Sequence, residues 1–421
     1  MNPKNGEILA LANAGDYDPN SYSEYDDFNR KNRCITDVYE PGSTMKAITL
    51  AALLDQGLCK ENEIINVENG VYKFRDRIIR DTHKHQKLTV QGILDQSSNV
   101  GMTKLIQRID DELLYKYLRG FGFGTYTSIE LPGEVKGTLK KPSEWSLVSK
   151  TFMSFGYELT ATPLQLITAF SALINGGILY QPQIVKKLMN SDGETKLEYQ
   201  HREVRRIIAP QTSDRMRTLL ASVVENGTAQ NAKLDFIAVG GKTGTSKIIE
   251  NGKYSESNYN SSFIGFYPVE DPQVVCLILL NSPKVGGYGG LVAAPIFKEV
   301  TKRILLNIHE SLENIPDSYQ KNDDVKFIKA KNIEEPKTTI TRSLSHNMPE
   351  NNNAPANKVM PDLKNRSIRE ALVILSSLGI DYKVSGSGKV ISQSILPGSR
   401  VKKDMVCKIL CTEIKNKVLA N

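Results

Sequence analysis

Apolar residues between position 1 and about position 308 recur with helical spacing in some segments and with strand spacing in others. Short breaks rich in Gly, Pro and Asn separate these segments, a pattern that predicts one mixed α/β domain. A strand is expected at GEILALAN. An antiparallel hairpin is expected for SSFIGFYPV and VVCLILLN, which are separated by the turn-forming EDPQ, and a closing helix is expected at APIFKEVTKRILLNI.

The composition changes after the predicted closing helix. Asn, Lys, Glu, Ser and Pro predominate over residues 309–357, and large apolar residues are too few to form a core, so this segment is predicted to be a disordered linker. Beyond it, an amphipathic helix from about Ser367 to Leu378 and short strands punctuated by SGSG and PG predict a second, small α+β domain over residues 358–415.

Composition and charge set broad limits on this picture. The 421 residues are enough for one large and one small domain, and a hydrophobic fraction of 40% with 7% aromatic residues is typical of soluble globular proteins. The net charge of +7 suits an anionic partner such as an acidic wall polymer or a membrane surface. Because the basic residues are scattered rather than clustered, nucleic acid is not expected as a partner.

The five cysteines and five histidines form no recognisable metal site in the sequence. The cysteines show neither the CxxC pairs of a zinc site nor the density of a disulfide-rich scaffold, so they are expected to be separate thiols. His83 and His85 lie in the polar stretch DTHKHQK, without suitably spaced partners elsewhere. We therefore expect neither a metal nor a cofactor.

The start of the sequence, MNPKNGEILALAN, has no basic n-region and no apolar h-region, and no apolar run of about 20 residues follows. No membrane-spanning segment is therefore predicted. Two interpretations remain open at this point. Either the protein acts in the cytoplasm, or the chain is a fragment that starts after a membrane anchor.

The first of three short polar motifs is STMK at residues 43–46. A Pro-Gly pair breaks the chain just before it, and an apolar run up to Gly57 predicts a helix that opens at Ser43. Ser43 and Lys46 then share one helix face, with Cβ atoms about 5–6 Å apart, so the Lys46 amine can take the Ser43 proton. Burial in an apolar helix lowers the pKa of a lysine towards the neutral form that a base needs. The alternative is a helix cap at Ser43 with Lys46 reaching solvent.

The second motif is SSN at residues 97–99. It falls on a turn between two predicted helices, where the side chains of Ser97, Ser98 and Asn99 can face a cleft. An ordinary N-cap of the following helix is a strong alternative for three small polar residues at such a place.

The third motif is KTGT at residues 242–245. It follows the apolar run FIAVGG and is predicted to lie on a strand, where Gly244 allows a ligand or another backbone to approach closely. Lys242 and the two threonines of the motif can bind a carboxylate there. The alternative is a solvent-facing edge strand with polar side chains.

The three motifs together form the S-x-x-K, S-x-N and K-T-G set found in penicillin-binding proteins and class A β-lactamases. On these motifs the chain resembles the transpeptidase domain of class B penicillin-binding proteins over roughly residues 2–305. The similarity continues through NRCITDVYEPGSTMK, LTVQGILDQSSNVG, IELPGE, SFGYELTATPLQL, GGKTGTS, SSFIGFYPVEDP and YGGLVAAPIFKEV. The stretches ITDVYEPGST and SFGYELTATPLQL are more like the division (septal) branch than the elongation branch.

The resemblance implies a peptidoglycan D,D-transpeptidase that cross-links D-Ala-D-Ala stem peptides and binds penicillin covalently. Ser43 is then the acylated nucleophile, Lys46 its base, and Ser97 with Asn99 the proton-relay and positioning pair. The terminal carboxylate of the stem peptide is bound by Lys242, Thr243, Gly244 and Thr245. The oxyanion hole is formed by the backbone N–H groups of the nucleophile and of the residue that matches Thr245.

The resemblance also implies a fold: a five-stranded antiparallel sheet with helices on both faces, a central nucleophile helix, and a first strand beside the closing hairpin. The C-terminal region resembles a PASTA domain, with MPDL, ALVILSSLGI and ISQSILPGSRVKKD as the matching stretches. Peptidoglycan or the catalytic domain itself is its expected partner. A packing appendage without a ligand is the alternative.

Full-length members of this family carry a cytoplasmic tail, one membrane anchor and an N-terminal pedestal, whereas this sequence starts where the catalytic domain would begin. The chain is accordingly interpreted as a fragment or a truncated gene model, with a place on the periplasmic, extracytoplasmic face of the membrane. Peptidoglycan stem peptides and β-lactams are the expected ligands. Division-machinery proteins and a glycosyltransferase are the expected protein partners.

Two other functions compete with the transpeptidase interpretation. The first is hydrolysis, as in a β-lactamase or a D,D-carboxypeptidase. However, more residues separate Ser97 from Lys242 along the sequence than separate the matching residues of compact lactamases. The nearest candidate for a deacylating glutamate, Glu144 in KPSEWS, matches a transpeptidase stretch better. The second is a non-catalytic protein that binds the wall or senses penicillin.

Overall fold

A computed structural model describes residues 1–309, except 16, 251 and 285, and residues 359–412, except 367–370, 373, 376–377, 386–388 and 402–404. Only the backbone is described for residues 306–309, 385 and 412. The chain divides into two compact units, Met1–Lys321 and Asn322–Asn421. Apart from residue 309, the predicted linker over 309–357 lies outside the described residues.

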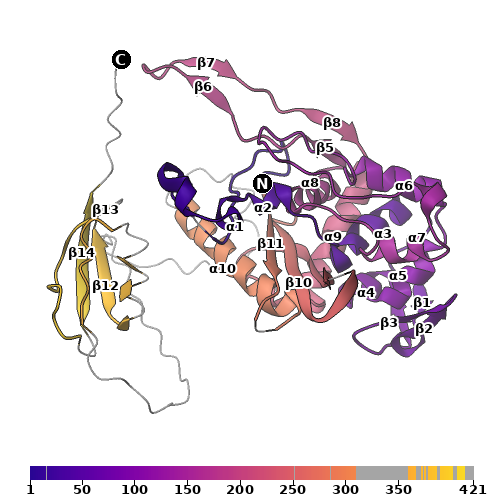
Figure 1. Ribbon diagram of the computed structural model, residues 1–421. Helices are drawn as coiled ribbons and strands as arrows, with labels where there is room; N and C mark the ends of the chain where they lie inside the picture. Colours follow the sequence, from indigo (N-terminus) through magenta and orange to yellow (C-terminus); the bar gives the residue numbers. More distant parts are fainter. Residues whose placement is uncertain are drawn as a thin grey trace, which may run out of the picture. The chain divides into compact units, whose positions relative to one another are not determined.

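A three-stranded antiparallel sheet runs through the first unit, with the strand order β11-β10-β9. Its strands are β9 (Gly240–Glu250), β10 (Lys253–Tyr267) and β11 (Val274–Asn281). Helix α10 (Gly289–His309) packs against this sheet, where the rings of Phe263 and Phe297 meet at 4.9 Å (Figure 1). The predicted hairpin, the strand under KTGT and the closing helix are confirmed.

The sheet differs from the expectation in two details. The described residues place three strands in it rather than five, and GEILALAN contributes one isolated bridge, at Glu7, instead of a strand. The physical reason is a turn closed by hydrogen bonds from Asn2 N–H to Glu7 O (2.8 Å) and from Gly6 N–H to Asn2 O (3.1 Å), with Gly6 at φ +83°. Because the turn redirects the backbone, only Met1 pairs with β11, through two hydrogen bonds to Val275.

Helix α3 (Met45–Asp55) is the central helix of the first unit, and every residue from Met45 to Leu54 is buried. It is surrounded by α5 (Asn99–Ile106), α6 (Asp111–Gly120), α7 (Ser149–Ser154), α8 (Pro163–Ile174) and α9 (Pro210–Asn226). A helix that is apolar on all sides is stable only inside such a bundle. The predicted helix is confirmed: the 3-10 turn η2 (Gly42–Thr44) leads into α3, and Gly57 follows its end with φ +66°.

Shorter elements complete the first unit. The helical ones are η1 (Pro19–Glu24), α1 (Asp27–Arg30), α2 (Arg33–Thr36), η3 (Glu68–Gly70), α4 (Val90–Asp95), η4 (Pro142–Glu144) and η5 (Gln230–Ala232). The strands pair two by two as β1 (Ile64–Asn66) with β4 (Lys87–Thr89), β2 (Val71–Phe74) with β3 (Arg77–Arg80), β5 (Ile178–Tyr180) with β8 (Glu203–Arg206), and β6 (Lys187–Met189) with β7 (Thr195–Glu198).

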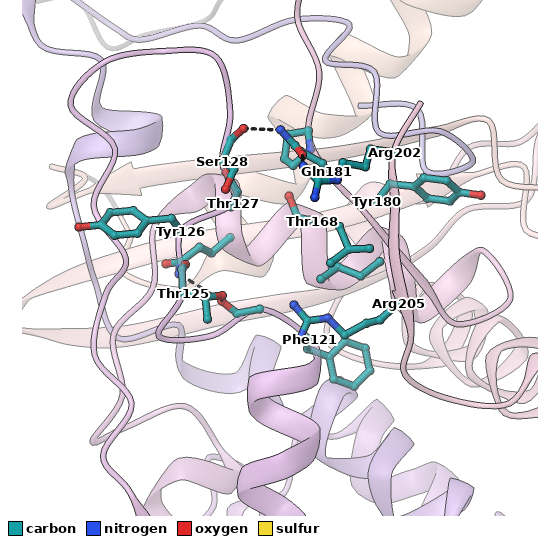
Figure 2. Close-up of a pocket in the computed structure, with 15 residues that line it drawn as sticks. Phe121, Thr125, Tyr126, Thr127, Ser128, Thr168, Tyr180, Gln181, Arg202 and Arg205 are labelled. Atoms are coloured by element: carbon teal, nitrogen blue, oxygen red, sulfur yellow. Dashed lines mark hydrogen bonds between the residues drawn. The ribbon is translucent and has the colours of Figure 1, made fainter. Parts of the chain in front are cut away.

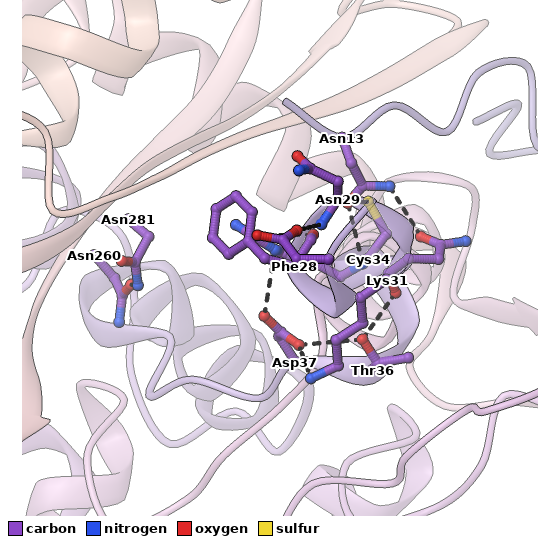
Figure 3. Close-up of polar contacts among 12 residues, drawn as sticks. Asn13, Phe28, Asn29, Lys31, Cys34, Thr36, Asp37, Asn260 and Asn281 are labelled. Carbon is purple, nitrogen blue, oxygen red and sulfur yellow. Dashed lines mark hydrogen bonds and ion pairs between the residues drawn. The ribbon is translucent and has the colours of Figure 1, made fainter. Parts of the chain in front are cut away.

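Polar side chains fix the segment that leads to α3 (Figure 3). Asn13 accepts a hydrogen bond from the Arg33 N–H at 3.1 Å, and Lys31 forms an ion pair with Asp37 at 2.8 Å. These contacts hold the two short helices α1 and α2 in place before the chain reaches η2.

The second unit contains a three-stranded sheet in the order β12-β14-β13. Strands β12 (Asp381–Ser385) and β14 (Val406–Thr412) are parallel, and β13 (Lys389–Gln393) runs antiparallel to β14. The Gln393 amide donates hydrogen bonds to Pro361 O (3.0 Å) and Ile395 O (2.7 Å) and accepts one from Leu363 N–H (2.6 Å). Gln393 therefore joins the MPDL stretch to the end of β13. The predicted helix near Ser367–Leu378 lies partly outside the described residues.

Across the described parts of both units, no helix is long and apolar enough to cross a membrane. All five cysteines are free thiols, as predicted.

Candidate active site

Ser43 lies in a tight turn that two neighbouring segments hold from both sides. Gly42 has φ +59° and donates its N–H to Gly156 O at 3.1 Å. A Cβ atom built on Gly42 would lie 3.0 Å from Thr245 O on β9, and one built on Gly244 would lie 3.0 Å from Pro41 O. The glycines therefore allow β9, which carries KTGT, to pack directly against the turn that carries Ser43.

The Gly156→Ala substitution is expected to lower the free energy of unfolding by about 2–5 kcal/mol. Gly156 has φ +87°, and an added Cβ would lie 2.1 Å from Gly42 O, so strain and a backbone clash add up. Gly176→Ala is the matched control, because Gly176 has φ +92° but no atom within 4 Å of its added Cβ. Thermal unfolding of both variants measures the difference, and equal losses would contradict the close packing of the Ser43 turn.

Lys46 is the second residue of α3 and is completely buried, with 0% of its surface exposed. Its Nζ donates hydrogen bonds to Ser97 O at 2.5 Å and to Ser97 Oγ at 3.1 Å. The alternative in which Lys46 reaches solvent is therefore wrong. Burial lowers the pKa of Lys46 well below its usual range, the charge of Lys242 lowers it further, and Asp81 opposes the shift.

Lys242 approaches the same hydroxyl from the strand side. It is also 0% exposed, and its Nζ donates to Ser97 Oγ at 3.1 Å. Burial lowers the pKa of Lys242 to about 7, with Asp95 opposing. The structure thus brings together one residue from each of the three motifs: Lys46, Ser97 and Lys242. The solvent-facing interpretation of KTGT is wrong for Lys242.

Ser97 reaches both lysines because its backbone takes φ +54° on the turn between α4 and α5, a conformation unusual for a serine. Its neighbour Ser98 has the ordinary capping role: its hydroxyl accepts the Gly101 N–H at 2.9 Å. Asn99 opens α5, and its amide donates to Arg80 O at 2.9 Å. The structure therefore places Ser97 between the lysines and connects the Asn99 donor to β3.

Asp81 is a residue of this site that the sequence analysis missed. Its carboxylate accepts hydrogen bonds from the Ser98 hydroxyl (2.5 Å) and from the backbone N–H groups of Asn99 (2.6 Å) and Val100 (2.9 Å). It therefore fixes the start of α5 and with it the SSN turn. Asp81 directly follows β3 and begins the polar DTHKHQK stretch, which gave no indication of its partner.

The other KTGT residues are anchored by their neighbours. The Thr243 hydroxyl lies 3.0 Å from the Thr228 hydroxyl, and Thr245 Oγ1 accepts the Gly289 N–H at 3.1 Å. A Cβ on Gly244 would lie 2.3 Å from Ser262 Oγ. The motif is thus held between η2, β10 and the start of α10.

Two further features lie apart from these residues. Glu144, the candidate for a deacylating glutamate, is exposed and accepts the Lys141 N–H at 3.0 Å, a local cap of η4.

A cavity of about 190 Å³ lies between α8 and the β5–β8 pair, with Thr168 and Arg205 among its lining residues (Figure 2). No residue of the three motifs lines it.

Each of the two units matches a known protein family. Residues 1–302 match the penicillin binding protein transpeptidase domain, and residues 358–410 match the PASTA domain.

The chain is also similar to individual curated proteins and to a solved structure of penicillin-binding proteins and their relatives. Stage V sporulation protein D of Bacillus subtilis is 33% identical over 429 residues, covering 100% of this chain and 61% of that protein. The probable peptidoglycan D,D-transpeptidase PenA of Neisseria meningitidis is 37% identical over 302 residues, covering 71% of this chain and 50% of that protein. Penicillin-binding protein 3 of Mycobacterium tuberculosis aligns with a TM-score of 0.67 and 29% identity, covering 73% of this chain and 72% of that one. The chain therefore spans between half and about three-fifths of the length of these two curated relatives.

Proposed function

The chain belongs to the penicillin-binding protein transpeptidase family, and on that premise we propose that it is a peptidoglycan D,D-transpeptidase that works through an acyl-serine at Ser43. The observation that carries the proposal is the buried Lys46, one turn after Ser43 and bonded to Ser97, which Lys242 also contacts. A neutral lysine in an apolar helix can serve as the base for a serine nucleophile.

In the first half-reaction, Ser43 Oγ attacks the carbonyl carbon between the two terminal D-Ala residues, and its proton passes to Lys46 Nζ. The C–N bond then breaks, and the leaving D-Ala amine takes up that proton. In the second half-reaction, the amine of a neighbouring stem peptide attacks the ester carbonyl. The new amide C–N bond forms, the ester C–O bond to Ser43 Oγ breaks, and the proton of the attacking amine returns to Ser43 Oγ by way of Lys46.

The strand β9 supplies the contacts to the substrate in this proposal. Lys242, Thr243 and Thr245 bind the terminal carboxylate, because they carry a cation and two hydroxyls beside the Ser43 turn. The backbone N–H groups of Ser43 and Thr245 stabilise the oxyanion. The close approach of Gly42 to Thr245 O supports this pairing. Ser97, between the two lysines, passes the proton, and Asn99 positions the peptide.

Transfer and hydrolysis are distinguished by one experiment. The protein is given a peptide ending in D-Ala-D-Ala together with an acceptor amine, and the released D-Ala, the amide product and the hydrolysed peptide are measured by mass spectrometry. The proposal predicts amide product that increases with acceptor concentration. Hydrolysed peptide alone would instead support the carboxypeptidase or β-lactamase alternative, and a stable penicillin adduct without turnover would support a penicillin sensor.

Membership of this family also suggests which ligands the protein binds and where it acts. The similar Mycobacterium tuberculosis structures include complexes with aztreonam and ampicillin, which supports β-lactams as inhibitors that acylate Ser43. We further propose action on the periplasmic, extracytoplasmic face of the membrane during cell division, with division-machinery proteins and a glycosyltransferase as partners. The C-terminal PASTA unit is proposed to bind peptidoglycan.

A further inference from the structure

Glu40 is a buried carboxylate three residues before Ser43, and the reaction outlined above does not use it. Only 8% of the Glu40 surface is exposed. Its Oε1 atom accepts hydrogen bonds from the Glu158 N–H at 2.9 Å and from the Tyr254 hydroxyl at 3.1 Å. Its Oε2 atom is buried and has no hydrogen-bond partner within the described residues. A buried carboxylate that is only half satisfied is costly to fold, so it calls for a functional reason.

Glu40 lies where three segments of the site meet. Its own backbone leads into the Ser43 turn, and its carbonyl accepts the Ser246 hydroxyl of β9 at 2.6 Å. The Glu158 N–H belongs to the segment whose Gly156 carbonyl accepts the Gly42 N–H. Glu40 therefore connects its own segment, which leads to the nucleophile, with two others. These are the segment that supports the Ser43 turn and the hairpin of β9 and β10.

The hairpin needs such a contact near its tip. Tyr254 pairs with Ile249 there, but the register of β9 and β10 shifts between Tyr254 and Tyr259, so regular pairing does not run continuously from the tip to KTGT. The ring of Tyr157 packs edge-on against Tyr254 at 5.7 Å between ring centroids. The Tyr254 hydroxyl donates to Glu40 and so connects the tip to this residue.

We propose that Glu40 is a positioning residue for acylation, whose carboxylate holds the tip of the β9–β10 hairpin and the Glu158 turn against the segment that carries Ser43. The inference rests on the proposed function, because β9 is also the strand that carries KTGT beside Ser43. When the tie is lost, the hairpin tip and β9 shift relative to Ser43, and acylation slows.

The test compares four variants by the rate of acylation with a penicillin. Glu40→Ala removes both hydrogen bonds and is expected to lower the rate about tenfold to a hundredfold. Glu40→Gln keeps an acceptor and is expected to restore most of the rate. Tyr254→Phe removes one hydroxyl and is expected to give an intermediate loss. Tyr259→Phe is the matched control on the same hairpin, because its hydroxyl donates to Glu256 O instead, and it is expected to react like the wild type.

The decisive readout is the double variant Glu40→Ala with Tyr254→Phe. It is expected to react no more slowly than Glu40→Ala alone, because the Tyr254 hydroxyl has already lost its partner. Losses that multiply, or a Glu40→Ala rate equal to that of the wild type, would overturn the proposal. Should Glu40→Ala fail to fold in thermal melting, Tyr254→Phe is compared with Tyr259→Phe, and a Tyr254→Phe rate equal to that of Tyr259→Phe would overturn the proposal.

Trypsin cleavage at Lys253, at the hairpin tip, provides a readout that needs no catalysis. Glu40→Ala is expected to be cut there several times faster than the wild type, and Tyr259→Phe at the wild-type rate. If the wild type forms no penicillin adduct but Glu40→Ala is still cleaved faster, the contact between Glu40 and the hairpin tip is supported and the proposed function is rejected. A reactive wild type whose Glu40→Ala variant changes in neither rate nor cleavage would reject the tie alone.

Discussion

Lys46→Met is expected to slow acylation by a penicillin about a hundredfold to ten-thousandfold, the contribution of a well-placed general base. Methionine keeps the length and apolar packing of the side chain inside α3, where Lys46 is fully buried, so the loss reports on the amine. The adduct is followed by mass spectrometry over time.

The control for this variant is Lys104→Met on the neighbouring helix α5, where Lys104 pairs with Glu68 at 2.5 Å. It is expected to acylate at the wild-type rate. A Lys46→Met protein that is folded and reacts as fast as this control would remove Lys46 from the mechanism.

The pH dependence of acylation gives a second view of Lys46. The base must be neutral, and burial lowers the pKa of Lys46 well below its ordinary 10.5. The rate of the wild type is therefore expected to rise with pH over the range in which Lys46 loses its proton, and this range lies well below pH 10.5. The small residual rate of Lys46→Met is expected to lack this rise.

Lys242→Met is expected to lower the acylation rate about a hundredfold to a thousandfold, the typical loss when one preorganised electrostatic contact is removed. Lys242 is buried, donates to Ser97 Oγ at 3.1 Å and is proposed to bind the substrate carboxylate. Penicillin and a penicillin ester are compared as reagents. The wild type is expected to prefer the free carboxylate strongly, and Lys242→Met to show little preference.

Lys233→Met is the control, since Lys233 is an exposed lysine shortly before β9 that pairs with Glu225. It is expected to keep both the rate and the preference for the carboxylate. A Lys242→Met variant that still prefers the free acid would show that another group binds the carboxylate.

Most of the secondary structure around the site follows from local pattern. The apolar run after STMK predicts α3, and the same run predicts the burial of Lys46, because a helix without a polar face offers its lysine no route to solvent. The strand under KTGT and the hairpin that follows it are confirmed for a similar reason, since their apolar runs and turn residues are local signals.

What the sequence could not supply is contact between distant segments. Ser97 takes a positive φ that no serine prefers by itself, and Asp81 and Glu40 find their partners across loops. Such contacts depend on how packed elements meet, and residue spacing carries no signal for them. The turn over residues 2–7 lies at the start of the predicted first strand, and it was a local signal that the apolar run GEILALAN outweighed.

Intact-mass measurement after incubation with a penicillin tests the central claim, that Ser43 is the acylated nucleophile, most directly. The wild type is expected to gain the mass of one penicillin, with peptide mapping locating it on Ser43, and Ser43→Ala is expected to gain none. A folded wild type that remains unmodified, or a Ser43→Ala protein that still forms the adduct, would contradict the account.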